Sequence, residues 1–349
     1  VALLGVGWTV ASQNGTSQAG VLPERVEYVP HPSNQPIGVA KGLMPGRVVW
    51  VHDPAVTDWG GPDSGQLWYA AVNQSVASGM VSRALRSYSN EDTDAAAWDA
   101  IFRSFNGGAG YQPGEKIVIK LNNGTCYQTD MYTYDKDPSV LNQIDTSPQL
   151  VVALLRQLVN VVGVNQSDIT IGDPGRAYSN HIYDLPHSEF PNVRYLDFQG
   201  GSGRTKALAS TTQFRWSTPA ANGKLPDCVP APYAEMDYFI NLAILKGHSS
   251  GITVCGKNLY GALYNRNPDG SLPNQPGVGV RNFYDMHLSL PNPEWSPGTG
   301  KYRAVVDLMG SKVLGDKTLL CLIDGLFAGY YWESVPRRWL SSPFAGDNG

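Results

Sequence analysis

The sequence predicts an α/β fold with a mixed, largely parallel sheet, helices on both faces, many loops and an irregular N-terminal extension. Three observations support this prediction. Short apolar runs typical of buried strands alternate with segments of helical spacing. One such segment, residues 147–163, connects the runs 116–121 and 168–172, which together make a βαβ unit with parallel strands. Polar residues follow several of the runs directly, as expected at the edge of such a sheet.

The predicted elements follow the alternating order that this fold requires. Thr93 is a suitable N-cap for one helix, and Ser147 with Pro148 begins another, whose leucines recur on one face. The segment 124–146 is long and rich in tyrosine, which makes it a candidate lid or substrate-binding insertion. The predicted helices are residues 72–88, 93–105 and 147–163. The predicted strands are residues 47–53, 116–121, 168–172, 193–197, 236–245, 302–308 and 318–323.

We expect two regions, an N-terminal arm at residues 1–46 and a single α/β domain at residues 47–349. The arm starts with apolar residues, contains many turn signals and has no amphipathic periodicity. Such a segment cannot bury its own apolar side chains, so its domain or a neighbouring copy has to cover it. We favour the neighbouring copy, which makes the arm a candidate element for a homo-oligomer.

The composition argues against a nucleic-acid partner, because the net charge is -4, the pI is about 5.9 and no basic run is present. Only 16% of the residues are charged, against about 25% in typical soluble domains. This low charge, with abundant Gly, Tyr and Trp, favours a secreted or periplasmic protein. No apolar run approaches the length of a transmembrane helix. The Asn-x-Ser/Thr sequons leave glycosylation undecided.

The four cysteines are far apart and form no C-x-x-C pair, so they do not have the close spacing of a ferredoxin-type iron–sulfur module. Cys255 and Cys321 lie in apolar runs and are expected to be core thiols. Cys126 and Cys228 lie in loop-like sequence and are a candidate disulfide. The sequence does not decide their redox state.

The stretch 236–264 is the most informative part of the chain. Its apolar strand changes abruptly to a polar sequence that contains Lys246 and His248, and a second polar step follows at Lys257 and Asn258. Glycines between these residues allow the backbone to approach a ligand closely. The structural alternative is a strand followed by a solvated turn.

This stretch resembles the signature of the domain-of-unknown-function 362 family. The matching residues are INL at 240–242, LKGH at 245–248, GITV at 251–254 and KNLYG at 257–261. A second block, GEKIVIKLN at 114–122, resembles a strand of the family, although Leu121 stands where proline is usual. The resemblance extends from about Arg47 to about Gly329. Some members carry ferredoxin modules, and the family name implies no reaction.

Four predicted strands end in polar side chains at the carboxyl edge of the sheet, where ligands bind in this fold class. Strand ends are often polar simply because they reach the surface. The convergence nevertheless favours a cationic site for a small anion such as a phosphate or carboxylate, and Asp173 and Asp324 are suited to pair with its cations or to hold a metal. We expect Lys120, Lys246 and His248 to share one cleft. The candidate ligand-binding residues are Asn122, Asp173, Arg176, Lys257, Asn258 and Asp324.

Two functions remain open, and we slightly favour the first. The first is an enzyme that acts on a small anionic substrate or cofactor, with His248 as general acid and base and with Lys120 and Lys246 holding the anion. The second is a secreted structural or self-assembling protein that uses the family fold as a scaffold.

The sequence contains no phosphate loop, no H-E-x-x-H zinc motif and no G-x-S-x-G elbow. The other histidines do not have metal-ligand spacing, although His181 and His187 follow the Asp173 strand and could approach the site. The reaction, the substrate, the cofactor and any metal are not determined by the sequence.

Overall fold

The computed structural model describes residues 41–217, 227–248, 251–264 and 304–340. The chain divides into two units, Val1–Lys41 and Gly42–Gly349, and the elements below belong to the second. Nearly all of the predicted N-terminal arm therefore lies outside the described residues, and its contact with another copy stays a prediction. Among the helices that are described, none has the length and apolar character needed to cross a membrane.

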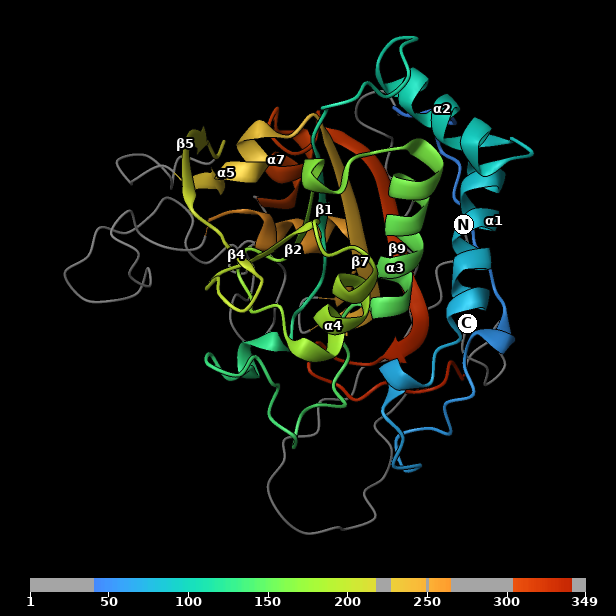
Figure 1. The fold of residues 1–349 in the computed structure, drawn as a ribbon, viewed down its shortest axis with the longest axis vertical. Coiled ribbons are helices and arrows are strands. Elements are labelled where there is room, and N and C mark those ends of the chain that lie inside the picture. The colour runs from blue at the N-terminus through green and yellow to red at the C-terminus, as the bar shows by residue number, and fades with distance from the viewer. Residues whose placement is uncertain (1–40, 218–226, 249–250, 265–303, 341–349) are drawn as a thin grey trace, which may run out of the picture. The chain divides into compact units, whose positions relative to one another are not determined.

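A mixed, largely parallel sheet of seven strands organises this unit, as Figure 1 shows. Its strand order is β4-β3-β2-β1-β7-β8, and β9 pairs with the other edge of β7. Every pair is parallel except β7 with β8, which is antiparallel. The strands are β1 (Ile117–Lys120), β2 (Ile169–Gly172), β3 (Arg194–Asp197), β4 (Thr205–Lys206), β7 (Tyr238–His248), β8 (Gly251–Thr253) and β9 (Thr318–Gly329). A separate antiparallel pair consists of β5 (Ala209–Phe214) and β6 (Asp227–Pro230).

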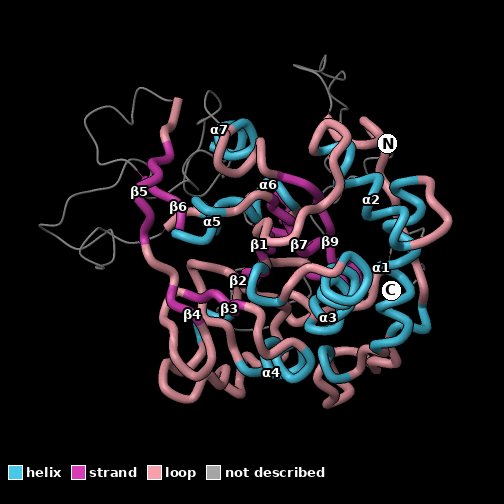
Figure 2. Tube along the Cα trace, turned by 45° about the horizontal axis from the view of Figure 1, so that its top comes forward, coloured by secondary structure: helices cyan, strands magenta, loops and turns pink. Residues whose placement is uncertain are grey.

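Helices cover both faces of the sheet (Figure 2). Side chains alternate between the faces along a strand, so Ile117 and Ile119 pack in a first core with helices α1 to α4, whereas Val118 packs in a second core with α5 and α7. The helices are α1 (Gln74–Ser89), α2 (Asp94–Phe105), α3 (Pro148–Arg156), α4 (Asn180–Glu189), α5 (Ala231–Glu235), α6 (Cys255–Asn258) and α7 (Ala304–Gly310). The predicted fold class is confirmed.

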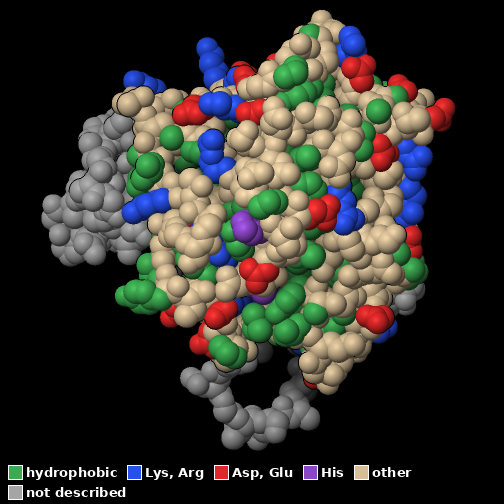
Figure 3. All heavy atoms as spheres, in the orientation of Figure 1, with side chains coloured by type: hydrophobic (Ala, Val, Ile, Leu, Met, Phe, Trp, Pro, Cys, Tyr) green, Lys and Arg blue, Asp and Glu red, His purple; other side chains and the backbone are tan. Residues whose placement is uncertain are grey.

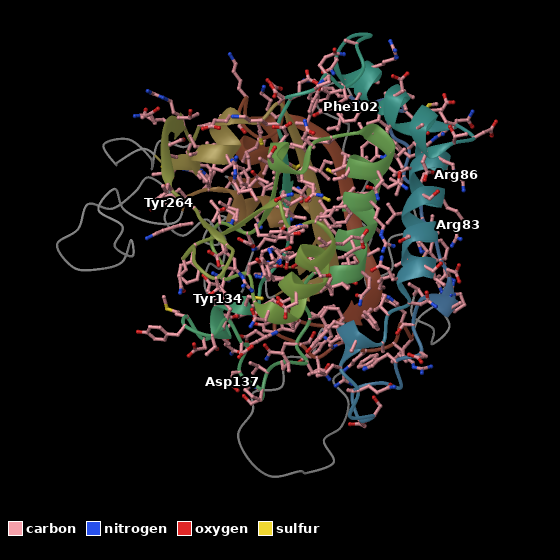
Figure 4. The ribbon with its side chains drawn as sticks, in the orientation of Figure 1. Arg83, Arg86, Phe102, Tyr134, Asp137 and Tyr264 are labelled. Carbon is pink, nitrogen blue, oxygen red and sulfur yellow. The ribbon has the colours of Figure 1, made fainter. Side chains whose placement is uncertain are left out.

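The helix ends have the caps that the sequence indicates. The Thr93 side chain accepts a hydrogen bond from the backbone N–H of Ala96 at the start of α2, and Asn73 caps α1 in the same way. Proline occupies the first position of α3, and the helix continues as a π-helical turn, Gln157–Val162, that ends at Gly163 with φ of 85°. On α1, Arg83 and Arg86 extend away from the sheet (Figure 4), and Arg83 pairs with Asp53 at 2.8 Å.

Two of the predicted strands are wrong. Residues 47–53 pair with no strand, and Val48 is 91% exposed, because this segment has no neighbour that would bury a β-branched face. Residues 302–308 were expected as a strand, but α7 occupies Ala304–Gly310 and buries Ala304 and Leu308, which are four residues apart. A short apolar run can form either a buried strand or a helix. Only the spacing of its buried residues distinguishes the two.

The cysteine predictions are also wrong. Cys126 and Cys228 are free thiols, since Cys126 lies in the first core beside Asp145 while Cys228 lies in β6 of the separate two-stranded sheet. Cys255 is half-buried and Cys321 is exposed, so neither is a core thiol. The apolar residues next to Cys321 in the sequence lie in β9, where side chains alternate between the two faces. Those that follow Cys255 lie in the turn after α6.

Candidate functional site

Lys120 is a buried lysine at the carboxyl end of β1. It pairs with Asn241 of β7 in the sheet register, so both side chains leave the same face, the one covered by α6. Its ammonium is 2.8 Å from Asp173 Oδ2 and also donates to Leu121 O and to Asn258 Oδ1. Burial lowers the pKa of Lys120, and the charge of Asp173 opposes this shift.

Asn258 of α6 connects these groups into one network. Its carboxamide donates to Asn241 Oδ1 at 2.8 Å and accepts from Asn122 Nδ2 at 3.1 Å. We call these five residues, Lys120, Asp173, Asn122, Asn241 and Asn258, the Lys120 network. A Cβ on Gly261 would lie 2.9 Å from the Lys120 ammonium, so any larger residue in the turn after α6 would displace this ammonium.

A second network surrounds Asp145 on the other face, in the first core. Its buried carboxylate is 2.9 Å from the Lys136 ammonium and accepts from both the backbone N–H and the hydroxyl of Thr125. The Cys126 thiol lies 3.4 Å and His181 Nε2 3.5 Å from the same carboxylate oxygen. We call these five residues the Asp145 network. Except for His181, none of them was recognised as polar site chemistry in the sequence, because they lie in a loop without periodicity.

Charge explains the protonation of the Asp145 network. Burial alone would raise the pKa of Asp145, but Lys136 and His181 outweigh it and hold this pKa well below its usual range. Burial, reinforced by Asp145, raises the pKa of the Cys126 thiol well above its usual value, and burial lowers the pKa of His181. The buried thiol is therefore a neutral group and a poor nucleophile.

Cys126, Asp145 and His181 also offer sulfur, oxygen and nitrogen atoms within 4.8 Å of one another, a donor set that suits zinc. Neither ring nitrogen of His181 has a hydrogen-bond partner among the described residues. The Lys136 ammonium, however, already contacts the carboxylate oxygen that a metal would use. A metal ion would have to displace this buried cation, so the arrangement fits a buried ion pair better than a metal centre.

Lys246 approaches the same edge of the sheet from the opposite face. It is five residues beyond Asn241 in β7, an odd separation that turns its side chain toward the first core. Its buried ammonium donates to Ile144 O and Trp332 O, both at 3.2 Å. Burial lowers the pKa of Lys246 to about 8, although Asp145 opposes the shift.

The loop after β1 connects the two faces. A Cβ on Gly124 would lie 3.3 Å from the Lys246 ammonium and 3.5 Å from Asn122 Oδ1, and Gly124 O accepts from the guanidinium of Arg176. The structure thus places Lys120 and Lys246 at one edge of the sheet but on different faces of it. His248, which we expected in the same cleft, ends β7 on the Lys246 face and is half-buried.

Lys257 of α6 lies near all of these cations. Burial, and then the charges of Lys120, Arg176 and Lys246, lower the pKa of Lys257 to about 7, while Asp173 has the opposite effect. Its ammonium is also 4.7 Å from the centre of the Tyr260 ring. Four cations are therefore close enough to influence one another, and the carboxylate that opposes them at Lys257 is already paired with Lys120.

Two carboxamides in the loop have unused hydrogen-bonding capacity. Both polar side-chain atoms of Asn123, and Oδ1 of Asn122, are buried without a partner among the described residues. A buried polar group left unpaired costs about 1–3 kcal/mol. A ligand that hydrogen-bonds with these atoms would remove this cost.

Asp324, the remaining predicted ligand, belongs to β9, and its carboxylate reaches the start of α3. Its carboxylate accepts from the backbone N–H of Ser147 at 2.9 Å and of Leu326 at 3.2 Å. Burial raises the pKa of Asp324 to about 6, although these hydrogen bonds and Lys246 oppose the shift.

Comparison with known families identifies a match for part of the chain. Residues 137–274 match the family Domain of unknown function (DUF362). This match confirms the family resemblance of the stretch 236–264 but does not reach the second block at 114–122. It includes Asp173, Lys246 and Lys257 but neither Lys120 nor Asp324. It covers less than half of the chain. No curated protein and no solved structure matches the chain.

Proposed function

We propose that the loops at the carboxyl ends of β1, β2 and β7 bind a small anion. The observation that supports this proposal is the gathering of Lys120, Arg176 and Lys246 around the half-buried Lys257, whose pKa is lowered to about 7 by burial and then by these three charges. Like charges that are gathered in a buried region repel one another strongly, because little water screens them. A bound anion would relieve this repulsion.

The polar groups at the site favour a carboxylate or a phosphate. The planar guanidinium of Arg176 is suited to two parallel hydrogen bonds with such a group. The buried carboxamide of Asn123 has free donors as well as a free acceptor. Both basic and acidic side chains are present on the face shown in Figure 3.

If the protein is an enzyme, Lys257 is a better acid–base candidate than His248. A lysine with a pKa near 7 can hold or release a proton at neutral pH, which general acid–base catalysis requires. The charges of Lys120, Arg176 and Lys246 all act on Lys257, whereas His248 lies on the face of β7 opposite Asn241 and Lys120. The proposed role is proton transfer to or from the bound anion.

Titration calorimetry of the full-length protein tests the proposal. The probes are inorganic phosphate, sulfate and a set of small mono- and dicarboxylates. We expect at least one of them to bind, and Lys257→Gln to weaken it by about tenfold, the equivalent of one charge-assisted hydrogen bond of about 1.4 kcal/mol. With sulfate, whose charge is constant between pH 6 and pH 8, binding should be tighter at pH 6, where Lys257 is protonated.

Lys116→Gln is the matched control, because Lys116 lies away from the site and forms an exposed ion pair with Glu235, with 2.7 Å between the ammonium and the carboxylate. It should bind each probe as the unaltered protein does. The proposal fails if no probe binds, or if the Lys257 variant and the control have the same affinity.

A further inference from the structure

Cys255 of α6 and Cys321 of β9 lie on the face of the sheet that α6 covers. Cys321 of β9 is the register partner of Asn241, so their side chains leave the same face of the sheet. The Asn241 carboxamide donates to the backbone carbonyl of Cys255 at 2.9 Å, which places α6 over that face. The Cys255 sulfur lies 3.6 Å from the carbonyl oxygen of Leu322, the residue that follows Cys321.

The two thiols interact with each other and shift each other's pKa. This interaction lowers the pKa of Cys321, and it raises the pKa of Cys255, where burial acts in the same direction. Cys321 is the exposed member of the pair and Cys255 the half-buried one, whereas Cys126 and Cys228 are buried. An accessible thiol with increased thiolate character beside a second thiol is the arrangement that thiol–disulfide exchange needs.

We propose that Cys255 and Cys321 form a reversible disulfide by exchange with a small-molecule disulfide such as oxidised glutathione. The thiolate of Cys321 attacks one glutathione sulfur, breaks the glutathione disulfide and releases one glutathione thiolate. Cys255 then loses its proton, attacks the sulfur of Cys321 and releases the second glutathione. Two protein thiols are oxidised and one molecule of oxidised glutathione is reduced to two thiols.

The disulfide connects α6 covalently to β9. Because α6 also carries Lys257 and Asn258, oxidation limits how far these two side chains can move from β7. The bond forms whether or not the site binds an anion, so its test is independent of the proposed function.

Intact-mass spectrometry of the full-length protein tests the proposal. The reduced protein is equilibrated with reduced and oxidised glutathione at several ratios, quenched in acid, and alkylated after denaturation. With more oxidised glutathione, we expect two of the four thiols to escape alkylation, and peptide mapping to find a cross-link between Cys255 and Cys321. Cys126 and Cys228 should remain alkylated throughout.

Single variants identify the attacking thiol. Cys255→Ser should accumulate glutathione on Cys321, because no second thiol remains to release it, whereas Cys321→Ser should acquire glutathione much more slowly. Cys228→Ser is the control and should form the same cross-link as the unaltered protein. The proposal is overturned if Cys255 and Cys321 in the unaltered protein stay open to alkylation at every glutathione ratio, or if the cross-link joins another pair. This result does not depend on the folding of any variant.

Discussion

At the scale of a single residue, the raised pKa of Asp324 predicts how the stability of the protein depends on pH. Its pKa is raised to about 6 in the folded protein, from an ordinary value of 3.8. Between these values the folded protein binds a proton at Asp324 that the unfolded chain releases, so this carboxyl makes the protein less stable as the pH rises from 4 to 6. Asn at this position keeps a side-chain oxygen for the N–H of Ser147 and cannot ionise.

Asp324→Asn should therefore stabilise the protein more at pH 7 than at pH 4.5, relative to the unaltered chain. Urea unfolding at both pH values measures the difference. A control is Asp137→Asn, since Asp137 is an exposed carboxyl whose pKa is lowered by its hydrogen bonds with Ser139; both its folded and unfolded pKa values lie below pH 4.5, so that variant should have the same effect at the two pH values. An equal effect of Asp324→Asn at the two pH values would show that this carboxyl is not protonated in the folded state.

Residue types alone identified part of the candidate site. Lys120 and Asp173 were predicted because polar groups directly follow apolar strand runs, and Asn258 because it lies in the KNLYG stretch; the structure brings all three into one hydrogen-bonded network. The opposite orientation of Lys246 depends on the β-sheet register, which no single strand reveals. Asp145 could not be found from sequence, because its partners come from a loop without periodicity and from α4.

At the scale of elements, the loop between β1 and α3 is held by the Asp145 network. Lys136→Met would leave the Asp145 carboxylate buried beside a reduced positive charge, and it removes the bonds from the ammonium to Thr125 and Gln143. Removal of one partner of a buried ion pair costs about 3–5 kcal/mol. We expect a loss of this size in the free energy of unfolding, measured in urea.

Lys116→Met is the matched control, since the exposed pair of Lys116 and Glu235 should contribute about 0–1 kcal/mol. The double variant Lys136→Met with Asp145→Asn should recover part of the stability, because it no longer buries an unpaired charge. If Lys136→Met and Lys116→Met cost the same, the Asp145 network does not stabilise the loop.

Elements with a clear period were predicted and irregular ones were not. The leucines of α3 and the apolar runs of β1, β2, β7 and β9 carry their own signal. The four-residue helix α6 has none, although it supplies Lys257 and Asn258, because so short a helix is stable only through its tertiary contacts. The same reason explains why a site built on α6 was visible only as a motif.

At the scale of the whole molecule, the second unit contains everything that the proposed anion site uses. Both hydrophobic cores, the seven-stranded sheet and all the cations at the site lie within residues 42–349. A fragment with these residues should therefore fold and bind the same anion as the full chain. Circular dichroism and the calorimetric titration measure the two properties on one preparation.

The same fragment tests the predicted role of the N-terminal arm. An apolar arm that is covered by a neighbouring copy should support an oligomer in the full chain that the fragment cannot form. Sedimentation velocity at matched concentrations compares the two, and we expect the full chain to sediment as an oligomer and the fragment as a monomer. Identical assembly states would remove the arm as the assembly element. A fragment that fails to fold would instead show that residues 1–41 are needed for folding of the second unit.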